Sequence, residues 1–451
     1  MKPEMQTGQS PRHHAFAALA GLLLGVALVK FGNPVILESK IQTPQTFWEF
    51  FYQPWPVHWG YIFLGATASA GLACGKLKPV GSRWIFFLPL LWLAWQCVSA
   101  TQTVSPELTR LTLLHFTATV GCFYLGWFAL AEVRDLRLFW LGVLAGFFWV
   151  LREGFDQRFG GLESTRQYFY LYILPQLKEP PVELMRKMST NRIFSTLFYP
   201  NTLAGAILLF LPVTIAGLLD WTRPLKPGSR GLLIGFFVCA ALACLYWSGS
   251  KSGWLLMLGL GGARMWHIQI LAAWRKWILI TVMAAGLAGF FIRYAGFFEK
   301  GATSVAARGD YWKAAGQIFL GNPVLGTGPG TFSIPYQQIK PPESEMARLA
   351  HNDYLQQASD SGFFGFLAYI AFISGILWVL YRKSDINIYP RRLALWLGIA
   401  AVCLQGFSEF NLYIPALAWP VFLFLGYFWE TASAHFVSEP SKPMYKPNGN
   451  D

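Results

Sequence analysis

The sequence predicts an all-α polytopic membrane protein with about 12 transmembrane helices and one large, partly helical outward loop. Of its 451 residues, 54% are hydrophobic and only 13% are charged, whereas a soluble domain has about 25% charged residues. Mean hydropathy is positive. Apolar runs of roughly 20 residues recur from end to end, and a helix needs this length to cross a bilayer core of about 30 Å. We therefore expect a single transmembrane domain that covers residues 1–451.

The apolar runs define twelve predicted spans. They cover residues 14–35, 58–75, 84–101, 108–131, 136–152, 198–219, 231–249, 252–270, 277–296, 361–381, 391–409 and 412–431. The first run follows a basic segment, as the apolar part of a signal peptide does. No convincing small-residue cleavage site follows it, so we expect this run to remain as the first helix.

The positive charge of the chain indicates its orientation in the membrane rather than nucleic-acid binding. The formal net charge is +13, and much of it lies in short connections on alternate gaps, such as "WTRPLKPGSR" and "YRKSDINIYPRR". Short basic connections stay in the cytoplasm. This rule places both termini in the cytoplasm and gives a consistent alternation along all twelve spans.

Two long segments face outward in this arrangement, residues 152–199 and residues 296–360. Long translocated loops escape the charge rule, and loops of this size are usually functional or disordered. The second contains "SVAARGDYWKAAGQIFL", whose apolar positions have helical spacing, so we expect it to be partly helical. The polar, Pro-rich residues 432–451 are predicted to form a disordered cytoplasmic tail.

The sequence lacks the motifs of several common catalytic and binding sites. The chain has no Walker loop, no dinucleotide-binding glycine motif, no HExxH and no GxSxG. The six cysteines lie within or beside apolar runs and show neither a disulfide framework nor zinc spacing. The nearest acidic pair in an outward segment, Glu343 and Glu345, is more typical of a solvated turn. These observations disfavour metal-dependent chemistry, and we predict no metal site.

Basic residues are the distinctive polar groups of the predicted outward side. Lys251 lies in the break between the seventh and eighth spans, where "SGSKSG" places small residues beside a cation. That combination suits a phosphate, although a lysine at a membrane boundary also reaches for lipid head groups. Arg308 in "ARGDYW" has the alternative of an ordinary loop pair with Asp310 or Trp312. Arg192 in "TNRIF" has the alternative of a head-group contact.

His351 opens the stretch "HNDYLQQASDSGFFG", which leads into the tenth span. Histidine is the side chain best suited to accept a proton near neutral pH, but a histidine near a membrane interface is often a hydrogen-bonded structural group. No Ser or Asp at suggestive spacing completes a hydrolase triad. Upstream of it, the glycines of "GTGPGTF" predict a tight reversal of the chain.

The order of these motifs resembles that of a known family. "NRIFSTLFYPNTLAGAILL", "SGSKSGW", "ARGDYWKAAGQIFLGNPVLGTGPGTF" and "AHNDYLQQASDSGFFGFLAYI" together resemble the signature region of the O-antigen ligase/polymerase superfamily. The resemblance covers about residues 192–372. Members of this superfamily are bacterial inner-membrane proteins that act on undecaprenyl-diphosphate-linked glycans.

The resemblance implies an all-helical membrane glycosyltransferase with a large periplasmic loop over a lateral lipid opening. It implies transfer of a glycan from undecaprenyl diphosphate to an acceptor hydroxyl at the periplasmic face, without a metal or another cofactor. The family's base corresponds to His351, and its cations against the diphosphate correspond to Arg308 and Lys251. Arg192 joins the expected substrate-binding set, and so do the neighbours of the histidine, Asn352 and Tyr354.

One position departs from the commonest family pattern, because lysine stands at 251 where the family has arginine. Lysine keeps the charge but lacks the two-pronged geometry of a guanidinium. Diphosphate recognition through two hydrogen bonds is therefore in question at this position.

The resemblance leaves three acceptors open. They are the lipid A core (a ligase), a growing lipid-linked glycan (an O-antigen or exopolysaccharide polymerase) and a protein hydroxyl (a protein O-oligosaccharyltransferase). A rival of another class is a flippase or transporter of lipid-linked glycans. That class predicts charged residues in mid-span and an internal repeat, and no repeat is evident in the sequence.

Overall fold

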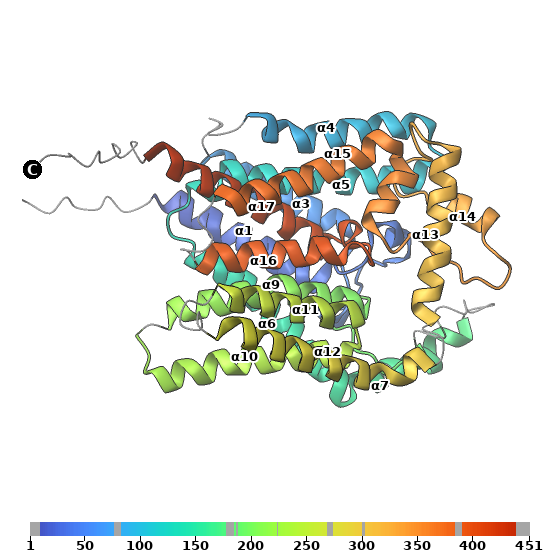
Figure 1. The fold of residues 1–451 in the computed structure, drawn as a ribbon. Helices are drawn as coiled ribbons and strands as arrows, with labels where there is room; N and C mark the ends of the chain where they lie inside the picture. Colours follow the sequence, from blue (N-terminus) through green and yellow to red (C-terminus); the bar gives the residue numbers. More distant parts are fainter. Residues whose placement is uncertain are drawn as a thin grey trace, which may run out of the picture.

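The computed structural model describes residues 10–75, 83–176, 185, 188–222, 224–267, 274–299, 303–383 and 390–438, and all regular structure within them is helical (Figure 1). The helices are α1 Pro11–Lys30, α2 Phe47–Tyr52, α3 Val57–Leu72, α4 Arg83–Ser99, α5 Pro106–Phe128, α6 Arg137–Asp156, α7 Leu162–Tyr168, α9 Pro200–Trp221, α10 Pro227–Ser248, α11 Lys251–Trp266, α12 Arg275–Glu299, α13 Thr303–Gly321, α14 Ser333–Ile339, α15 Asp353–Lys383, α16 Pro390–Gln405 and α17 Pro415–Ser438.

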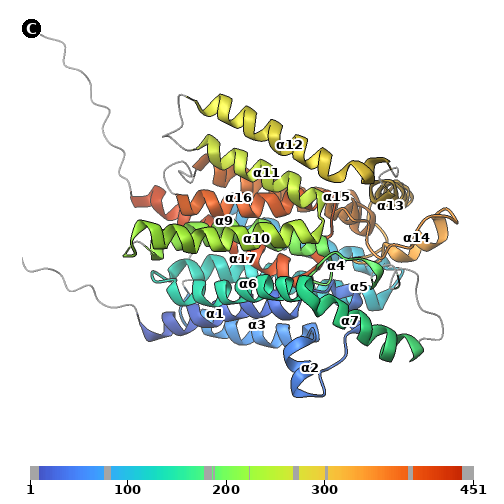
Figure 2. The same ribbon diagram turned by 90° about the horizontal axis from the view of Figure 1, so that it is seen from below.

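The long helices lie side by side in one bundle, and each of the twelve predicted spans falls on one of them (Figures 1 and 2). By length and composition, 8 helices of the described chain are suited to cross a membrane. Three others, α3, α11 and α16, have 16 residues each. At about 1.5 Å per residue, such a helix is shorter than the bilayer core. The all-α polytopic membrane class is confirmed, whereas twelve crossings remain a prediction.

Small residues let the central helices approach closely. The main packed pairs are α5 with α17, α1 with α6, and α9 with α16. A Cβ atom on Gly21 would lie 2.2 Å from the carbonyl oxygen of Phe139, and one on Gly126 would lie 2.0 Å from that of Leu423. In a bilayer, where apolar burial drives little association, such close backbone contacts give the packing its specificity.

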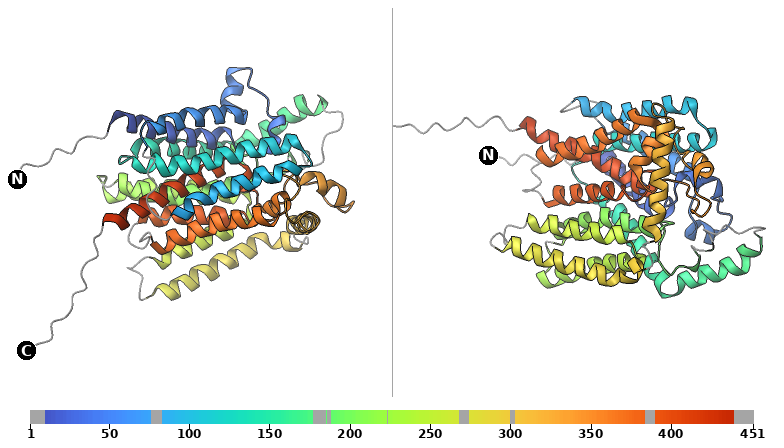
Figure 3. Two further views of the ribbon diagram at one scale, coloured as in Figure 1. Left: turned by 90° about the horizontal axis from the view of Figure 1, so that it is seen from above. Right: turned by 45° about the vertical axis from the view of Figure 1, so that its right-hand side comes forward.

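The connections differ between the two ends of the bundle. The end that carries α7, α13 and α14 is called the loop end here, and α13 runs across the ends of the long helices there (Figures 1 and 3). The first residue of α1 and the last of α17 lie at the opposite end. The start of α1 and the end of α17 therefore lie on the same side of the bundle. Which side faces the cytoplasm stays a prediction.

Several predicted boundaries differ from the observed ones. α15 begins at Asp353, well before the predicted span 361–381, and it bends at Gly362, where φ is 68°. The sequence pattern missed this first part because its polar side chains are buried against protein, as Gln356 and Gln357 are. The predicted outward segment 152–199 includes the end of α6 and all of α7, so it is not a simple loop.

The predicted tail also begins later than expected. α17 continues to Ser438, so the first part of the predicted segment 432–451 is helical. Residues 439–451 lie outside the described part of the chain.

The predicted orientation gives a labelling test. With the native cysteines replaced, a cysteine at Glu343 should react with a membrane-impermeant maleimide from outside, and one at Ser229 should react only after permeabilisation. Both positions are exposed. Ser229 lies in the first turn of α10, and Glu343 follows α14, one of the helices of the loop end. Equal labelling of the two in intact cells would contradict the orientation.

Candidate functional site

A buried carboxylate organises the loop end. Glu409 lies in the connection between α16 and α17, and only 4% of it is exposed. Its Oε1 atom forms an ion pair with Arg308 of α13 and accepts a hydrogen bond of 2.6 Å from the side chain of Asn201 at the start of α9. The Nε atom of Arg308 also donates to the carbonyl of Ser408, at 3.0 Å. Segments about 100 and 200 residues apart in sequence thus meet at one side chain.

Arg192 extends this network to the break between α10 and α11. Its guanidinium donates to Asn201 Oδ1 at 2.9 Å and to the carbonyl of Ser248 at 2.7 Å. Gly249 then reverses the chain with φ 60°, a conformation that glycine adopts without strain. The side chain of Ser250 caps α11 by accepting from the backbone N–H of Gly253. Lys251, the first residue of α11, is thereby fixed beside Arg192.

Lys251 is held by aromatic rings. Its Nζ atom lies 3.8 Å from the ring centroid of Phe297 and 5.0 Å from that of Tyr294, both near the end of α12. The positive charges of Arg192, Arg308 and Arg293 also act on its ammonium group. Arg293 itself lies over the rings of Tyr246 and Tyr294.

His351 completes the cluster. Its Nδ1 atom lies 3.5 Å from Glu409 Oε2, a long contact that becomes an ion pair when the imidazole is protonated. The ring stacks on Tyr311 at 5.6 Å and meets Phe410 edge-on at 4.6 Å. The backbone of His351 is left-handed, with φ 50°. The two aromatic rings and the carboxylate therefore hold the imidazole in one orientation.

The charges around Glu409 are unbalanced. Burial alone would raise the pKa of Glu409, but the charge of Arg308, the contact with His351 and the charge of Arg192 together hold this pKa below its ordinary value. Glu409 is therefore an anion at neutral pH. Among the described residues, Arg192 and Arg308 act on this carboxylate and also on Lys251, and Arg293 acts on Lys251 as well. The excess positive charge suits an anionic ligand.

The predicted site residues Asn352 and Tyr354, just after His351 in the chain, bond to the backbone of neighbouring segments. Asn352 donates to the carbonyl of Phe407 at 3.0 Å, and its side-chain oxygen accepts from the N–H groups of Tyr354 and Leu355, which caps α15. The hydroxyl of Tyr354 donates to the carbonyl of Cys403 at 2.9 Å. These contacts tie the start of α15 to the α16–α17 connection that carries Glu409.

A buried polar network supports the same region from behind. Asp360 accepts hydrogen bonds from the N–H of Gly330 at 2.8 Å and from the hydroxyl of Tyr413 at 3.1 Å. The glycines 326, 328 and 330 have φ between 68° and 104°, so "GTGPGTF" forms the predicted tight reversal. Asp360 thus fixes this loop against α15 and against the connection after Glu409.

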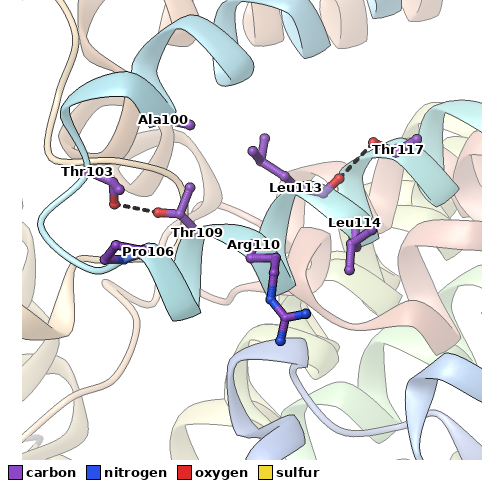
Figure 4. A pocket seen from close by; sticks show the side chains of 8 residues that line it. All are labelled: Ala100, Thr103, Pro106, Thr109, Arg110, Leu113, Leu114 and Thr117. Atoms are coloured by element: carbon purple, nitrogen blue, oxygen red, sulfur yellow. Dashed lines mark hydrogen bonds between the residues drawn. The ribbon is translucent and has the colours of Figure 1, made fainter.

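A cavity that is separate from this cluster also lies at the loop end. It has about 350 Å³ and is formed by the turn before α5 and the first half of α5, with Arg110 beside it (Figure 4). None of the six predicted site residues lines it. In the described part of the chain, no group of three His, Cys, Asp or Glu side chains is placed to hold a metal ion.

The structure brings together four of the six predicted site residues: Arg192, Lys251, Arg308 and His351. Sequence reasoning missed Glu409, which it included as the last residue of the predicted span 391–409. A signal was present, because a lone carboxylate within an apolar run is costly and by default suggests a functional site. α16 ends at Gln405, so Glu409 lies beyond the helix.

The fold and the site together define a class: a helical membrane protein with a cluster of basic side chains at one end of its bundle. Within it, residues 234–370 match the family model described as O-antigen ligase, which supports the O-antigen ligase/polymerase superfamily that the motifs indicated. The match includes Lys251, Arg308 and His351. Arg192 and Glu409 lie outside it and enter the cluster through the fold. No curated protein matches the chain.

Proposed function

We propose that the protein transfers a glycan from undecaprenyl diphosphate to an acceptor hydroxyl at the periplasmic face of the bacterial inner membrane. The observation that carries this proposal is the cluster at the loop end. In it, Arg192, Arg308 and His351 act on the buried carboxylate of Glu409, and the charges of Arg192 and Arg308 also act on Lys251. A lipid-borne donor places its diphosphate at the membrane boundary. Lys251 at the start of α11 and Arg308 in α13 offer their charges at the loop end of the bundle.

The cations act on the leaving group. When the bond between the sugar C1 and the diphosphate oxygen breaks, its electron pair goes to the diphosphate, whose negative charge grows. Fixed positive charges near that oxygen stabilise the transition state, which is usually the largest catalytic contribution. Because the rings of Phe297 and Tyr294 hold Lys251, and Glu409 holds Arg308, these charges are in place before the reaction. We propose that they perform the role for which other transferases use a metal.

His351 accepts the proton of the acceptor hydroxyl in this mechanism. Its buried Nδ1 atom faces Glu409, which leaves Nε2 to meet the hydroxyl. The acceptor oxygen bonds to C1 as its proton moves to Nε2. Glu409 stabilises the imidazolium that forms, as a carboxylate does beside a catalytic histidine. In this proposal Asn352 and Tyr354 are positioning residues, because they hold the connection that carries Glu409.

The acceptor that we propose is a lipid A core, so the protein acts as a ligase. Deletion of the gene, followed by analysis of surface glycans, tests this choice. Loss of a ligase leaves the core without attached long glycan, whereas loss of a polymerase leaves single repeat units on the core. Unchanged lipopolysaccharide with altered glycoproteins would favour transfer to protein. The position of the charges at helix ends rather than in mid-span supports an enzyme over a transporter.

The cations give a matched set of variants. Arg308→Ala should lower transfer by at least about 10²-fold, because it removes a charge aimed at the leaving group. Arg348→Ala, in the same outward segment but exposed and outside the cluster, should leave transfer unchanged. Lys251→Arg should keep activity and Lys251→Ala should lose most of it. Transfer from purified lipid-linked donor is the measurement, and full activity of both alanine variants at 251 and 308 would contradict the role of these cations.

A further inference from the structure

The helix α6 continues into an arm beyond the bundle. After Asp156 the helix kinks at Phe159 and Gly160, where φ is 140° at the glycine, and continues through α7 (Figures 2 and 3). A cavity of about 220 Å³ lies at this kink. Its polar lining comes from Gln157, Arg158, Glu163, Arg166 and Asn191.

This cavity adjoins the cationic cluster through one short segment. Asn191, in its wall, directly precedes Arg192. Arg166 donates to Asn191 Oδ1 at 3.0 Å and to the carbonyls of Thr190 and Met188. The cavity wall and the cluster are therefore parts of one fixed structure. The Cα atoms of Asn191, in the wall, and Arg192, in the cluster, are only about 3.8 Å apart.

The opposite wall is fixed in the same way. The buried side-chain oxygen of Gln157 accepts from the N–H groups of Phe194 and Ser195, at 3.0 and 2.8 Å. Its amide nitrogen donates to the carbonyl of Ser195 at 3.0 Å. Gln157 thus joins the kink to the segment just after Arg192, and this part of the cavity has a preformed shape.

The lining offers the groups that recognise a sugar ring. Arg158 makes no hydrogen bond or ion pair within the described chain, and its guanidinium lies 5.9 Å from the ring centroid of Trp247. Glu163 pairs with Arg166 at 2.5 Å through one oxygen, and its side chain is 56% exposed. Phe159 does not line the cavity itself, but it lies between two residues that do, Arg158 and Gly160. It is 75% exposed, and its ring centroid is 5.7 Å from that of Trp247. A sugar ring needs hydroxyl partners of both kinds and an apolar face for its C–H groups.

Two other ligands fit this lining less well. A second phosphate would meet the carboxylate of Glu163, which repels it. A lipid chain would cover Arg158 and Glu163 and remove their charges from water without a partner, which is costly. The modest volume suits one polar ring, since pockets for larger ligands are typically 300–1,000 Å³.

We infer that this cavity is a subsite for a sugar of the donor glycan, next to the diphosphate held at Arg192. The inference rests on the proposed function, because it requires a glycan diphosphate at the cluster. Arg158 and Glu163 bond to sugar hydroxyls, and Phe159 lies against the C–H face of the ring.

Two probes test the subsite with the full-length protein in nanodiscs. They are an undecaprenyl-diphosphate-linked oligosaccharide and undecaprenyl diphosphate without a glycan, with affinity measured by native mass spectrometry. The double variant Arg158→Gln, Phe159→Ala should weaken binding of the glycan-bearing probe about tenfold, because it removes hydrogen-bonding charge and the aromatic contact. Binding of the bare diphosphate should stay at the parent value. In transfer assays, KM for donor should rise while kcat stays near the parent value.

A control on the same arm is Tyr172→Ala, which is exposed and does not line the cavity. It should bind both probes as the parent does. Equal weakening of both probes by the double variant would show a contact with lipid or a disturbed fold, and no weakening of either would show that no sugar binds there; each result overturns the subsite. Failure of the parent protein to bind either probe would overturn the proposed function itself, and the subsite with it.

Discussion

Replacement of His351 by asparagine should lower the turnover of lipid-linked donor by about 10²–10⁴-fold, the usual contribution of a general base. Asparagine is a more specific test than alanine, because it tolerates the left-handed backbone that His351 adopts, with φ 50°. The variant therefore keeps the chain conformation and removes the group that accepts the proton. Transfer by purified protein, with thermal unfolding measured in parallel, separates loss of chemistry from loss of fold.

The control for this prediction is His58→Asn. His58 lies at the loop end near Glu38, with its side chain 60% exposed, and it is outside the cluster. This variant should transfer glycan at the parent rate. His351→Asn should still bind the lipid-linked donor, because the cations remain. A folded His351→Asn variant that turns over donor at the parent rate would rule out the base assignment.

The structural alternative for His351 predicts a different pattern. The ring packs between Tyr311 and Phe410, and its carbonyl accepts from the indole of Trp312 at 3.3 Å. If packing were its main role, loss of the imidazole would lower thermal stability and expression together with activity. The catalytic role predicts a selective loss of activity, with thermal stability and expression unchanged.

The apolar runs predicted the helices of the bundle well. Each apolar run became a helix, because in a bilayer the backbone must satisfy its own hydrogen bonds. The pattern failed where polar side chains are buried against protein instead of lipid. The first turns of α15 contain Gln357, which accepts from the indole of Trp92 at 2.8 Å and donates to Tyr413. Mean hydropathy has no means of distinguishing such a satisfied glutamine from one in water.

The sequence alone predicted only part of the candidate site. Single motifs marked Lys251, Arg308 and His351 as candidates, but each also had an ordinary explanation. Arg308 and His351 are joined by Glu409, which lies 101 residues after Arg308 in the chain. Contacts at this separation depend on how α13 crosses the bundle, and no local pattern encodes that. A lone carboxylate between two apolar runs was the one available signal.

Removal of the charge of Glu409 should disturb more side chains of the cluster than any other single substitution there. Glu409→Gln keeps the size of the side chain and its hydrogen bond with Asn201 but leaves Arg308 and Arg192 without their shared anion. Breaking a buried ion pair from one side typically costs about 3–5 kcal/mol. Arg308 is 16% exposed, so water partly offsets this cost. We expect transfer to fall at least as far as in Arg308→Ala, because both Arg308 and His351 lose their positioning partner.

The pH dependence of stability gives this prediction a second, independent measurement. The folded-state pKa of Glu409 lies below the ordinary 4.5, so in acid the unfolded chain binds a proton before the folded chain does. The stability contributed by the ion pair is therefore complete above about pH 4.5 and is lost as pH falls through the lower folded-state value. Thermal unfolding of detergent-purified parent protein should show this acid loss, and Glu409→Gln should show less of it. Glu38→Gln, at the loop end but outside the cluster, should retain the acid loss of the parent. An acid profile of Glu409→Gln that matches the parent, together with parent-level transfer, would remove Glu409 from the centre of the site.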